Sequence, residues 1–381
     1  MQCSLYIHFP FCLKKCLYCD FNSLADSPVS PDEYVDGVQK EMVSRAGQFP
    51  GPVTAPTLYF GGGTPSLMAP ELAARLIETA QRLYGLAGDA EITLEANPGT
   101  LTAAKLAGYR QAGVNRLSLG VQSFNDSFLQ ALGRIHTARE ADEAFAMARA
   151  AGFADIGVDL IHSLPGETVE SWLDDLARAV SLGPEHISAY GLTIEAGTPF
   201  HDLERGGRLS PSDEDEGARM FRQTGEFLRE RGFEQYEISN FALPGYRSRH
   251  NQVYWQRGGY LGFGAGAHSY LPRPGHGRRW RNRLSPQAYL EAVYRSKPVE
   301  EEVTILTERD AMAEFLFLGL RMLDGVKPEY FVKEFGMTLD DAYPGVLPAL
   351  IAEGLLHRRG EWLGLTGTGL IFSNQVFLRF I

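Results

Sequence analysis

The residues most able to do chemistry in this 381-residue chain are four cysteines near its start. Cys12, Cys16 and Cys19 follow one another with the spacing C-x3-C-x2-C, and Cys3 precedes them. Cysteine thiolates hold iron–sulfur clusters, and an ordinary electron-transfer [4Fe-4S] cluster takes four of them. Three neighbouring cysteines would hold three irons and leave the fourth open, and an open metal position is typical of a site that binds a substrate.

Two other interpretations of the cysteines remain open on spacing alone. A structural zinc ion could use Cys3 or His8 as a fourth ligand, although zinc sites usually combine two C-x2-C pairs or add a spaced histidine pair. The thiols could also be reduced and exposed. A disulfide framework is excluded because all four cysteines fall within the first nineteen residues.

A glycine-rich segment, Gly61-Gly62-Gly63-Thr64-Pro65-Ser66, is a second candidate for ligand binding. Glycines let a ligand approach the backbone and leave peptide groups free to hydrogen-bond it. The segment matches neither a P-loop nor the G-x-G-x-x-G fingerprint. By itself it could be only a tight turn.

Polar residues also stand at the ends of apolar runs further along the chain. Glu95, Gln122 and Asp159 each end such a run, and Arg134 lies in LGRIH. Any one of them could simply cap a loop or a helix. Together they are the kind of residues that line the mouth of a barrel, where the carboxyl ends of its strands meet.

The elements that must position these residues are short apolar runs alternating with amphipathic helical segments. The predicted strands are 5–8, 57–60, 91–95, 117–121, 156–161 and 187–192. Ser30 with Glu33, and Thr137 with Glu140, indicate capping boxes, and Gly152 and Gly183 indicate helix ends. Six βα units predict an α/β fold, a partial (β/α)6 barrel, because a closed barrel has eight. A doubly wound sheet is the competing arrangement.

The rest of the chain predicts two further regions, so that the expected domains are 1–200, 201–295 and 296–381. The middle region contains an acidic helix start after Ser212 and a strand at 235–241. The last region predicts a small α/β and helical, winged-helix-like domain. Its first helix should present Phe315, Leu318 and Met322 on one face.

Composition limits the partners. The chain carries 36 Lys and Arg against 47 Asp and Glu, a net charge of −11, which disfavours nucleic acid and anionic lipid. We expect no integral membrane segment, because no apolar stretch approaches the length of a membrane span. The N-terminus lacks the pattern of a signal peptide, so we predict a cytoplasmic protein.

Taken together, YIHFPFCLKKCLYCDFNS and GGGTP resemble the radical S-adenosylmethionine (SAM) enzymes, and specifically the oxygen-independent coproporphyrinogen III oxidase-like group. The resemblance implies a [4Fe-4S] cluster on Cys12, Cys16 and Cys19, whose open iron binds SAM and whose reduction cleaves SAM to a 5′-deoxyadenosyl radical. It also implies a set of SAM-binding residues: Tyr6, Gly62, Gly63, Thr64, Glu95, Gln122, Arg134 and Asp159.

Within that group the chain resembles the heme chaperone branch, which carries HNxxYW, here His250 to Trp255. That resemblance implies heme as cargo, an electron donor, and client hemoproteins such as membrane-associated respiratory enzymes. His250 is the predicted heme ligand, and the alternative is that its ring hydrogen-bonds internally. His268 is a second candidate ligand.

The competing function is the oxidase itself, which decarboxylates coproporphyrinogen III to protoporphyrinogen IX. Authentic oxidases usually carry a further cysteine two positions after the third, where this chain has Phe21. Their N-terminal extension before the cluster is also longer. Both departures favour the heme chaperone, and no residue is assigned a catalytic role.

Overall fold

Six parallel strands form the centre of the fold, and all six predicted strands are confirmed. The computed structural model describes residues 1–49 and 51–381. The strands are β1 (Ser4–Phe9), β2 (Ala55–Gly62), β3 (Leu86–Ala96), β4 (Arg116–Gln122), β5 (Asp155–His162) and β6 (His186–Gly191). They lie side by side in chain order, whereas a doubly wound sheet reverses its order at a switch point. The partial barrel is therefore confirmed.

The two faces of these strands differ in polarity. In β4, Leu117, Leu119 and Val121 are fully buried and belong to the main hydrophobic core. Because side chains alternate along a strand, Arg116, Ser118, Gly120 and Gln122 lie on the opposite face. The other strands repeat the pattern, with Leu5, Ile7, Leu58, Phe60, Leu94, Ile156 and Val158 in the same core. The apolar face packs against helices, and the inner face is polar.

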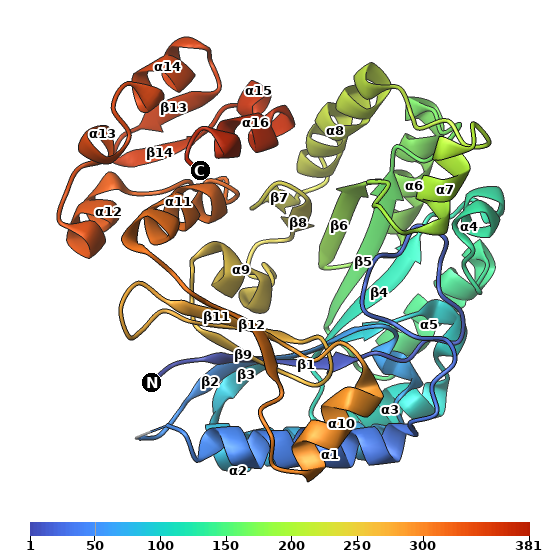
Figure 1. Cartoon of the computed structure of the whole chain (residues 1–381). Helices are drawn as coiled ribbons and strands as arrows, with labels where there is room; N and C mark the ends of the chain where they lie inside the picture. Colours follow the sequence, from blue (N-terminus) through green and yellow to red (C-terminus); the bar gives the residue numbers. More distant parts are fainter. Residues whose placement is uncertain (50) are drawn as a thin grey trace.

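Helices cover the apolar face between successive strands (Figure 1). They are α1 (Pro31–Ala46), α2 (Pro70–Tyr84), α3 (Ala103–Ala112), α4 (Asp126–Leu132), α5 (Ala138–Ala150) and α6 (Val169–Ser181), with short 3-10 turns η1 (Pro65–Leu67) and η2 (Pro98–Thr100). The capping box of Thr137 and Glu140 is confirmed. Gly152 (φ +87°) and Gly183 (φ +73°) follow helix ends in the left-handed region, as predicted.

The predicted capping box at Ser30 is only half formed. The Ser30 hydroxyl accepts a hydrogen bond from the Glu33 backbone N–H, but the reciprocal bond from the Ser30 N–H to the Glu33 side chain is not made. Pro31 still begins the helix at its first position, where a missing N–H costs nothing.

Strands from the middle of the chain extend the sheet at both edges. β7 (Glu234–Gln235) and β8 (Asn240–Ala242) continue antiparallel beyond β6, while β9 (Tyr260–Phe263) lies parallel to β1 and leads to β10 (His268–Leu271), β11 (Arg278–Asn282) and β12 (Glu300–Ile305). The helices of this region are α7 (Pro199–Arg205), α8 (Glu214–Arg229), α9 (Arg249–Trp255) and α10 (Pro286–Tyr294). Figure 1 shows α9 between the two ends of the extended sheet.

Two predictions for this region meet different outcomes. The single strand predicted at 235–241 is wrong, because the buried Glu237 carboxylate accepts hydrogen bonds from the Ser239 N–H (2.8 Å) and the Asn240 amide (2.5 Å) and bends the segment into a hairpin. The acidic helix start is confirmed, with Asp213 as the cap of α8.

The C-terminal segment forms a second hydrophobic core from helices and a hairpin. It contains α11 (Glu308–Gly319), α12 (Pro328–Phe335), α13 (Leu339–Ala342), α14 (Val346–Ala352), α15 (Gly367–Ile371) and α16 (Ser373–Leu378), with the antiparallel pair β13 (Leu356–Arg359) and β14 (Trp362–Leu365). The predicted face of Phe315, Leu318 and Met322 is only partly confirmed. Phe315 packs against Phe331 and Phe335, and Met322 is buried, although it lies beyond the end of the helix. Leu318 is only half-buried, and Met312, Leu316 and Leu320 are buried instead. The domain boundaries stay predictions, and β12 pairs within the large sheet.

Within residues 1–49 and 51–381, the structure contains no helix with the length and hydropathy needed to cross a membrane.

Candidate cofactor-binding cavity

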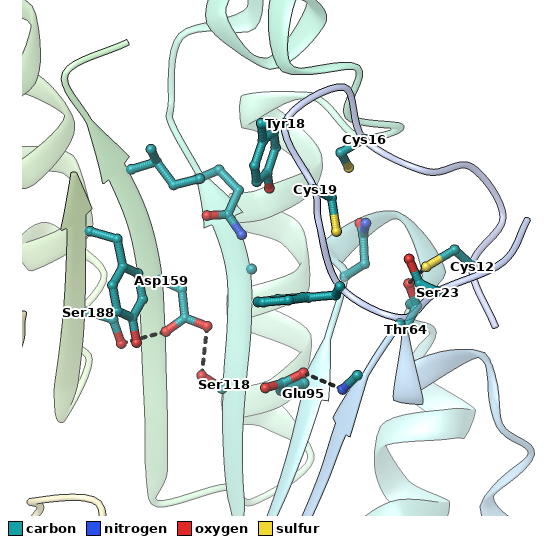
Figure 2. A pocket seen from close by; sticks show the side chains of 18 of the residues that line it. Cys12, Cys16, Tyr18, Cys19, Ser23, Thr64, Glu95, Ser118, Asp159 and Ser188 are labelled. Atoms are coloured by element: carbon teal, nitrogen blue, oxygen red, sulfur yellow. Dashed lines mark hydrogen bonds between the residues drawn. The ribbon is translucent and has the colours of Figure 1, made fainter. Parts of the chain in front are cut away.

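A cavity of about 370 Å³ lies on the polar inner face of the barrel. It is lined by most of the residues that the sequence singled out: Cys12, Cys16, Cys19, Gly62, Gly63, Thr64, Glu95, Gln122, Arg134 and Asp159. Figure 2 shows the cysteine loop on one side, with Glu95, Ser118 and Asp159 on the strands across from it. The structure thus brings together residues spread over about 150 positions of the chain.

The cysteine loop follows β1 and is held in place by backbone hydrogen bonds. The Cys12 N–H donates to the Leu24 carbonyl at 2.9 Å, and the Leu17 N–H donates to the Leu132 carbonyl at 3.0 Å. Two of the sulfurs face hydrogen-bond donors: the Thr64 hydroxyl lies 3.4 Å from Cys12 Sγ, and Arg134 Nη1 lies 3.5 Å from Cys16 Sγ.

The thiols differ in environment and are not gathered around one point. Burial raises the pKa of the Cys19 thiol above its usual value. Among residues 1–49 and 51–381, no group of three His, Cys, Asp or Glu side chains is placed to hold a single metal ion.

The glycine segment packs tightly against the cysteine loop. Gly62 has a φ of +116°, and a Cβ there would lie 2.6 Å from the His8 ring; a Cβ on Gly63 would lie 2.7 Å from the Phe11 carbonyl. The Gly63 and Thr64 N–H groups donate to the Phe9 (2.9 Å) and Phe11 (2.8 Å) carbonyls. Glycine is therefore required for close approach of two backbone segments.

The expectation that these peptide groups are free needs correction for the N–H groups. The Gly62 N–H donates to the Glu95 carboxylate at 3.2 Å. The backbone N–H groups of Gly62, Gly63 and Thr64 therefore all form hydrogen bonds within the protein. A ligand at this edge would meet carbonyl oxygens and side chains.

Two carboxylates lie on the inner face, on the strands either side of β4. Glu95 accepts a hydrogen bond from the Tyr59 hydroxyl at 2.8 Å, and burial together with the nearby Asp159 raises its pKa to about 7 against the hydrogen bonds from Tyr59 and Gly62, which lower it. Asp159 accepts from Ser118 and Ser188, both at 2.7 Å, and burial raises its pKa despite these bonds. Both groups therefore hold a proton more readily than an exposed carboxylate does.

Gln122 and Arg134 approach the cavity from the end of β4 and from the loop before α5. The pairing of β4 with β5 is irregular between Gly120 and Gln122, and Gln122 has a φ of +72°. Such a conformation is rare for a residue other than glycine and is found at functional sites. Arg134 donates from Nη2 to the Gly120 carbonyl at 2.5 Å, while its buried Nε has no hydrogen-bond partner among the described residues.

Tyr6 is not among the residues that line the cavity. Its hydroxyl pairs with His8 Nδ1 at 3.1 Å, and its ring stacks on Tyr59 and His250 with centroid distances of 6.1 and 6.4 Å. Tyr6 therefore supports the cavity from behind, through Tyr59.

His250 is also outside the cavity lining and is 1% exposed. Its Nδ1 pairs with the Thr57 hydroxyl at 2.7 Å and its Nε2 with the Tyr254 hydroxyl at 2.8 Å. Burial, with a smaller contribution from Arg116, lowers the pKa of His250 to about 3, so the ring is neutral. Both ring nitrogens have internal partners, which is the alternative that the sequence left open. His268 is exposed on β10.

The helix that carries His250 connects three parts of the molecule. The Glu91 carboxylate on β3 accepts hydrogen bonds from the backbone N–H groups of Arg249 and His250 at 2.8 and 2.9 Å, which fixes the start of α9. Asn251 lines the cavity. At the other end of the helix, the Arg321 guanidinium lies 4.2 Å from the Trp255 ring.

Several polar residues of the cavity were missed by the sequence predictions. Tyr59, Arg116, Ser118, His186 and Ser188 line it from the inner faces of β2, β4 and β6. A signal was present in RLSLGVQ, where polar and small residues alternate with Leu and Val. A strand of a parallel sheet is usually apolar on both faces, so strict alternation there indicates a polar interior.

The chain is similar to known proteins along almost its whole length. The Radical SAM superfamily model matches residues 6–179, and the HemN C-terminal domain model matches residues 306–372. Heme chaperone HemW of Bacillus subtilis is 36% identical over 99% of both chains, and that of Escherichia coli is 37% identical over 99% of this chain and 98% of its own length. The mitochondrial radical S-adenosyl methionine domain-containing protein 1 of Mus musculus is 38% identical over 99% of this chain and 87% of its own.

Among solved structures, coproporphyrinogen III oxidase (HemN) of Escherichia coli superposes with a TM-score of 0.84 at 23% identity, covering 99% of this chain and 89% of that one. This likeness concerns the fold. An incomplete barrel with three cysteines after its first strand is the arrangement of a radical SAM protein. Within that superfamily, the chain belongs to the HemW heme chaperone family.

Proposed function

We propose that this protein binds heme and delivers it to client hemoproteins, with a [4Fe-4S] cluster and SAM held in the cavity. The observation that carries the proposal is similarity along the whole chain to relatives named heme chaperones. The cavity supports it, because the thiols and the strand-end polar residues meet there. Respiratory enzymes are the expected clients, and the cytoplasm is the expected compartment.

The donor set fits an iron–sulfur cluster on Cys12, Cys16 and Cys19. All three sulfurs belong to one cavity wall, and thiolates are the ligands that such clusters take. The Thr64 hydroxyl and the Arg134 guanidinium, beside two of the sulfurs, would stabilise the charged thiolate form. When bound, the cluster supplies one-electron reduction of the sulfonium of SAM.

The remaining lining fits the polar groups of SAM. Ribose hydroxyls are donors, and the Glu95 and Asp159 carboxylates can accept from them. The methionine carboxylate needs a cation, and Arg134 has a buried Nε that no described residue hydrogen-bonds. The amino group needs acceptors, which the carbonyl edge of Gly62 and Gly63 can offer. Gln122 and Thr64 complete the polar lining, and Tyr6 would act by supporting Tyr59.

Heme ligation by His250 carries a cost in this structure. The ring would have to give up its hydrogen bond to Tyr254 and become exposed, and an unpaired buried hydroxyl costs about 1–3 kcal/mol. The contacts therefore support an internal role for His250, with a heme ligand elsewhere.

The decisive experiment separates the carrier from the oxidase. After anaerobic reconstitution of the cluster, one sample receives hemin and another receives coproporphyrinogen III with SAM and a reductant. We expect stoichiometric hemin binding, followed by transfer to an apo-hemoprotein, and no protoporphyrinogen. Protoporphyrinogen formation without stable hemin binding would select the oxidase instead.

Metal analysis of the same preparation tests the remaining alternative. Iron and acid-labile sulfide are expected in nearly equal amounts. Zinc without iron or sulfide would select the structural zinc protein that the cysteine spacing left open.

A further inference from the structure

The deep end of the cavity contains a buried cation without a hydrogen-bonded counterpart. Arg116, the first residue of β4, is 2% exposed and lines the cavity. Its Nε forms an ion pair with the Asp155 carboxylate at 3.6 Å, and neither this Nε nor Asp155 Oδ1 has a hydrogen-bond partner among the described residues. A guanidinium presents five N–H donors, and burial without partners for them is costly.

A second unpartnered donor lies beside it. His186, the first residue of β6, is 1% exposed and lines the same cavity. Its Nε2 pairs with the Tyr236 hydroxyl at 2.8 Å, and that hydroxyl already accepts from the Ser248 N–H at 3.3 Å. Because the Ser248 N–H is itself a donor, Nε2 is the one acceptor that the described residues offer to the hydroxyl proton. A hydroxyl that donates to Nε2 places the ring proton of the neutral histidine on Nδ1. Nδ1 is buried and has no partner among the described residues.

The two donors flank a position without a side chain. Gly157 on β5 lies opposite His186 in the sheet register. A Cβ on Gly157 would lie 3.4 Å from His186 Nδ1 and 3.5 Å from Arg116 Nη2. The guanidinium on β4 and the imidazole N–H on β6 therefore converge over β5, which lies between these two strands and has no side chain at Gly157.

Nearby carboxylates do not fill this position. Asp159 accepts hydrogen bonds from Ser118 and Ser188. Glu91 accepts hydrogen bonds from the backbone N–H groups at the start of α9. Asp155 balances the charge of Arg116 but forms no hydrogen bond with it. One positive group and one neutral N–H together match the two oxygens of a carboxylate.

We propose that Arg116 and His186 form a subsite for the carboxylate of an organic ligand, and that this ligand is heme, bound through a propionate. The identity of the ligand rests on the proposed function. Heme propionates project from one edge of the macrocycle, so that a heme entering edge-on would place one of them deep in the cavity. Arg134, beside the cysteines, is the separate cation available to the carboxylate of SAM.

The test compares hemin with hemin dimethyl ester, in which the propionates are blocked, on the anaerobically reconstituted protein. The wild-type protein should bind the ester about 10- to 100-fold more weakly than hemin, the loss expected for a buried charged hydrogen bond. Arg116→Gln should weaken the binding of hemin by the same factor and leave the binding of the ester unchanged. Arg116→Lys, which keeps the charge, should recover part of the affinity. SAM affinity should be unaffected in all variants.

The matched control is Arg178→Gln, which breaks an arginine–aspartate pair between α6 and Asp142 on α5, and neither partner lines the cavity. It should bind both porphyrins as the wild type does. Equal binding of hemin and its ester by the wild-type protein would overturn the subsite without any substitution, and the proposed function would stand. Loss of SAM affinity with unchanged hemin affinity would assign Arg116 to SAM and also overturn it. Absence of hemin binding by the wild type would reject the proposed function and the subsite together.

Discussion

The cysteine loop and α9 both carry residues that could bind iron, but the structure treats them in opposite ways. The sulfurs of Cys12, Cys16 and Cys19 border the cavity, and hydrogen-bond donors lie beside those of Cys12 and Cys16. His250 has an internal partner on each ring nitrogen and lies outside the cavity lining. Residue type therefore predicts the chemistry that a side chain can do, and its hydrogen-bond partners decide whether it is available.

The largest expected effect is on the cysteine side of this comparison. Cys16→Ser should abolish the cluster, because only two thiolates would remain in the loop, and iron, sulfide and the broad visible absorbance should fall together. Cys3→Ser is the matched control, since Cys3 is buried beside Ser4 and outside the cavity lining. Cluster loss in the Cys3 variant and retention in the Cys16 variant would break the assignment.

On the α9 side, His250→Ala should act on stability. It removes a buried ring, leaves Thr57 and Tyr254 without their partners, and should lower the free energy of unfolding by about 2–4 kcal/mol. Denaturant titration measures the loss. Hemin binding by the folded fraction should persist, and its complete loss in a variant of wild-type stability would restore His250 as the heme ligand.

A third prediction concerns charge within the cavity. Because the pKa of Glu95 is about 7 when folded and 4.5 ordinarily, the native state binds more protons than the unfolded state between these values. Glu95 therefore stabilises the fold less as pH rises through that window. Glu95→Gln should gain about 2 kcal/mol relative to the wild type between pH 5 and pH 8, as measured by denaturant titration.

Glu140→Gln provides a control of opposite sign for the pH experiment. Hydrogen bonds from Thr137 lower the pKa of Glu140, so its carboxylate contributes stability above its ordinary pKa and loses it as pH falls. The Glu140 variant should be less stable than the wild type at neutral pH, and the difference in stability should disappear as the pH becomes acidic. A parallel pH response of both variants would contradict the environment assigned to Glu95.

The smallest effect sharpens the account of His250. Tyr254→Phe removes the hydroxyl bonded to Nε2 and should cost about 1 kcal/mol. If Nε2 then becomes free to bind iron, hemin should show the absorbance change of new histidine ligation. An unchanged spectrum would indicate that the ring stays buried even without its hydroxyl partner.

Much of the fold could be predicted from the sequence because its signals are local. The strands and the Thr137 box depend on neighbouring residues, and so does the left-handed turn at Gly152. The hairpin around Glu237 could not be read locally, since a strand pattern is interrupted there by a buried carboxylate that binds the chain back on itself. The full extent of the buried face of α11 could not be predicted locally, because it depends on which sides of the helix pack against α12 and α16.

The site was predicted unevenly for a related reason. Cysteines and glycines identify themselves by type and spacing, and their cavity positions follow from the strand ends. Arg116 and His186 stand at strand starts, deep inside the barrel, where no motif marks them. Tyr6 and His250 lie outside the cavity lining only because of how the side chains pack. To predict this for Tyr6, one would have to know that Tyr59 lies between Tyr6 and the cavity.

A seven-residue helix is too short to bend, and α9 is such a helix. Asn251 forms part of the cavity wall at one end, and Trp255 stacks with Arg321 of the C-terminal segment at the other. Glu91 anchors its first turn to the barrel floor. The C-terminal segment is therefore joined to the cavity wall through one short, rigid helix whose first turn is fixed to the barrel.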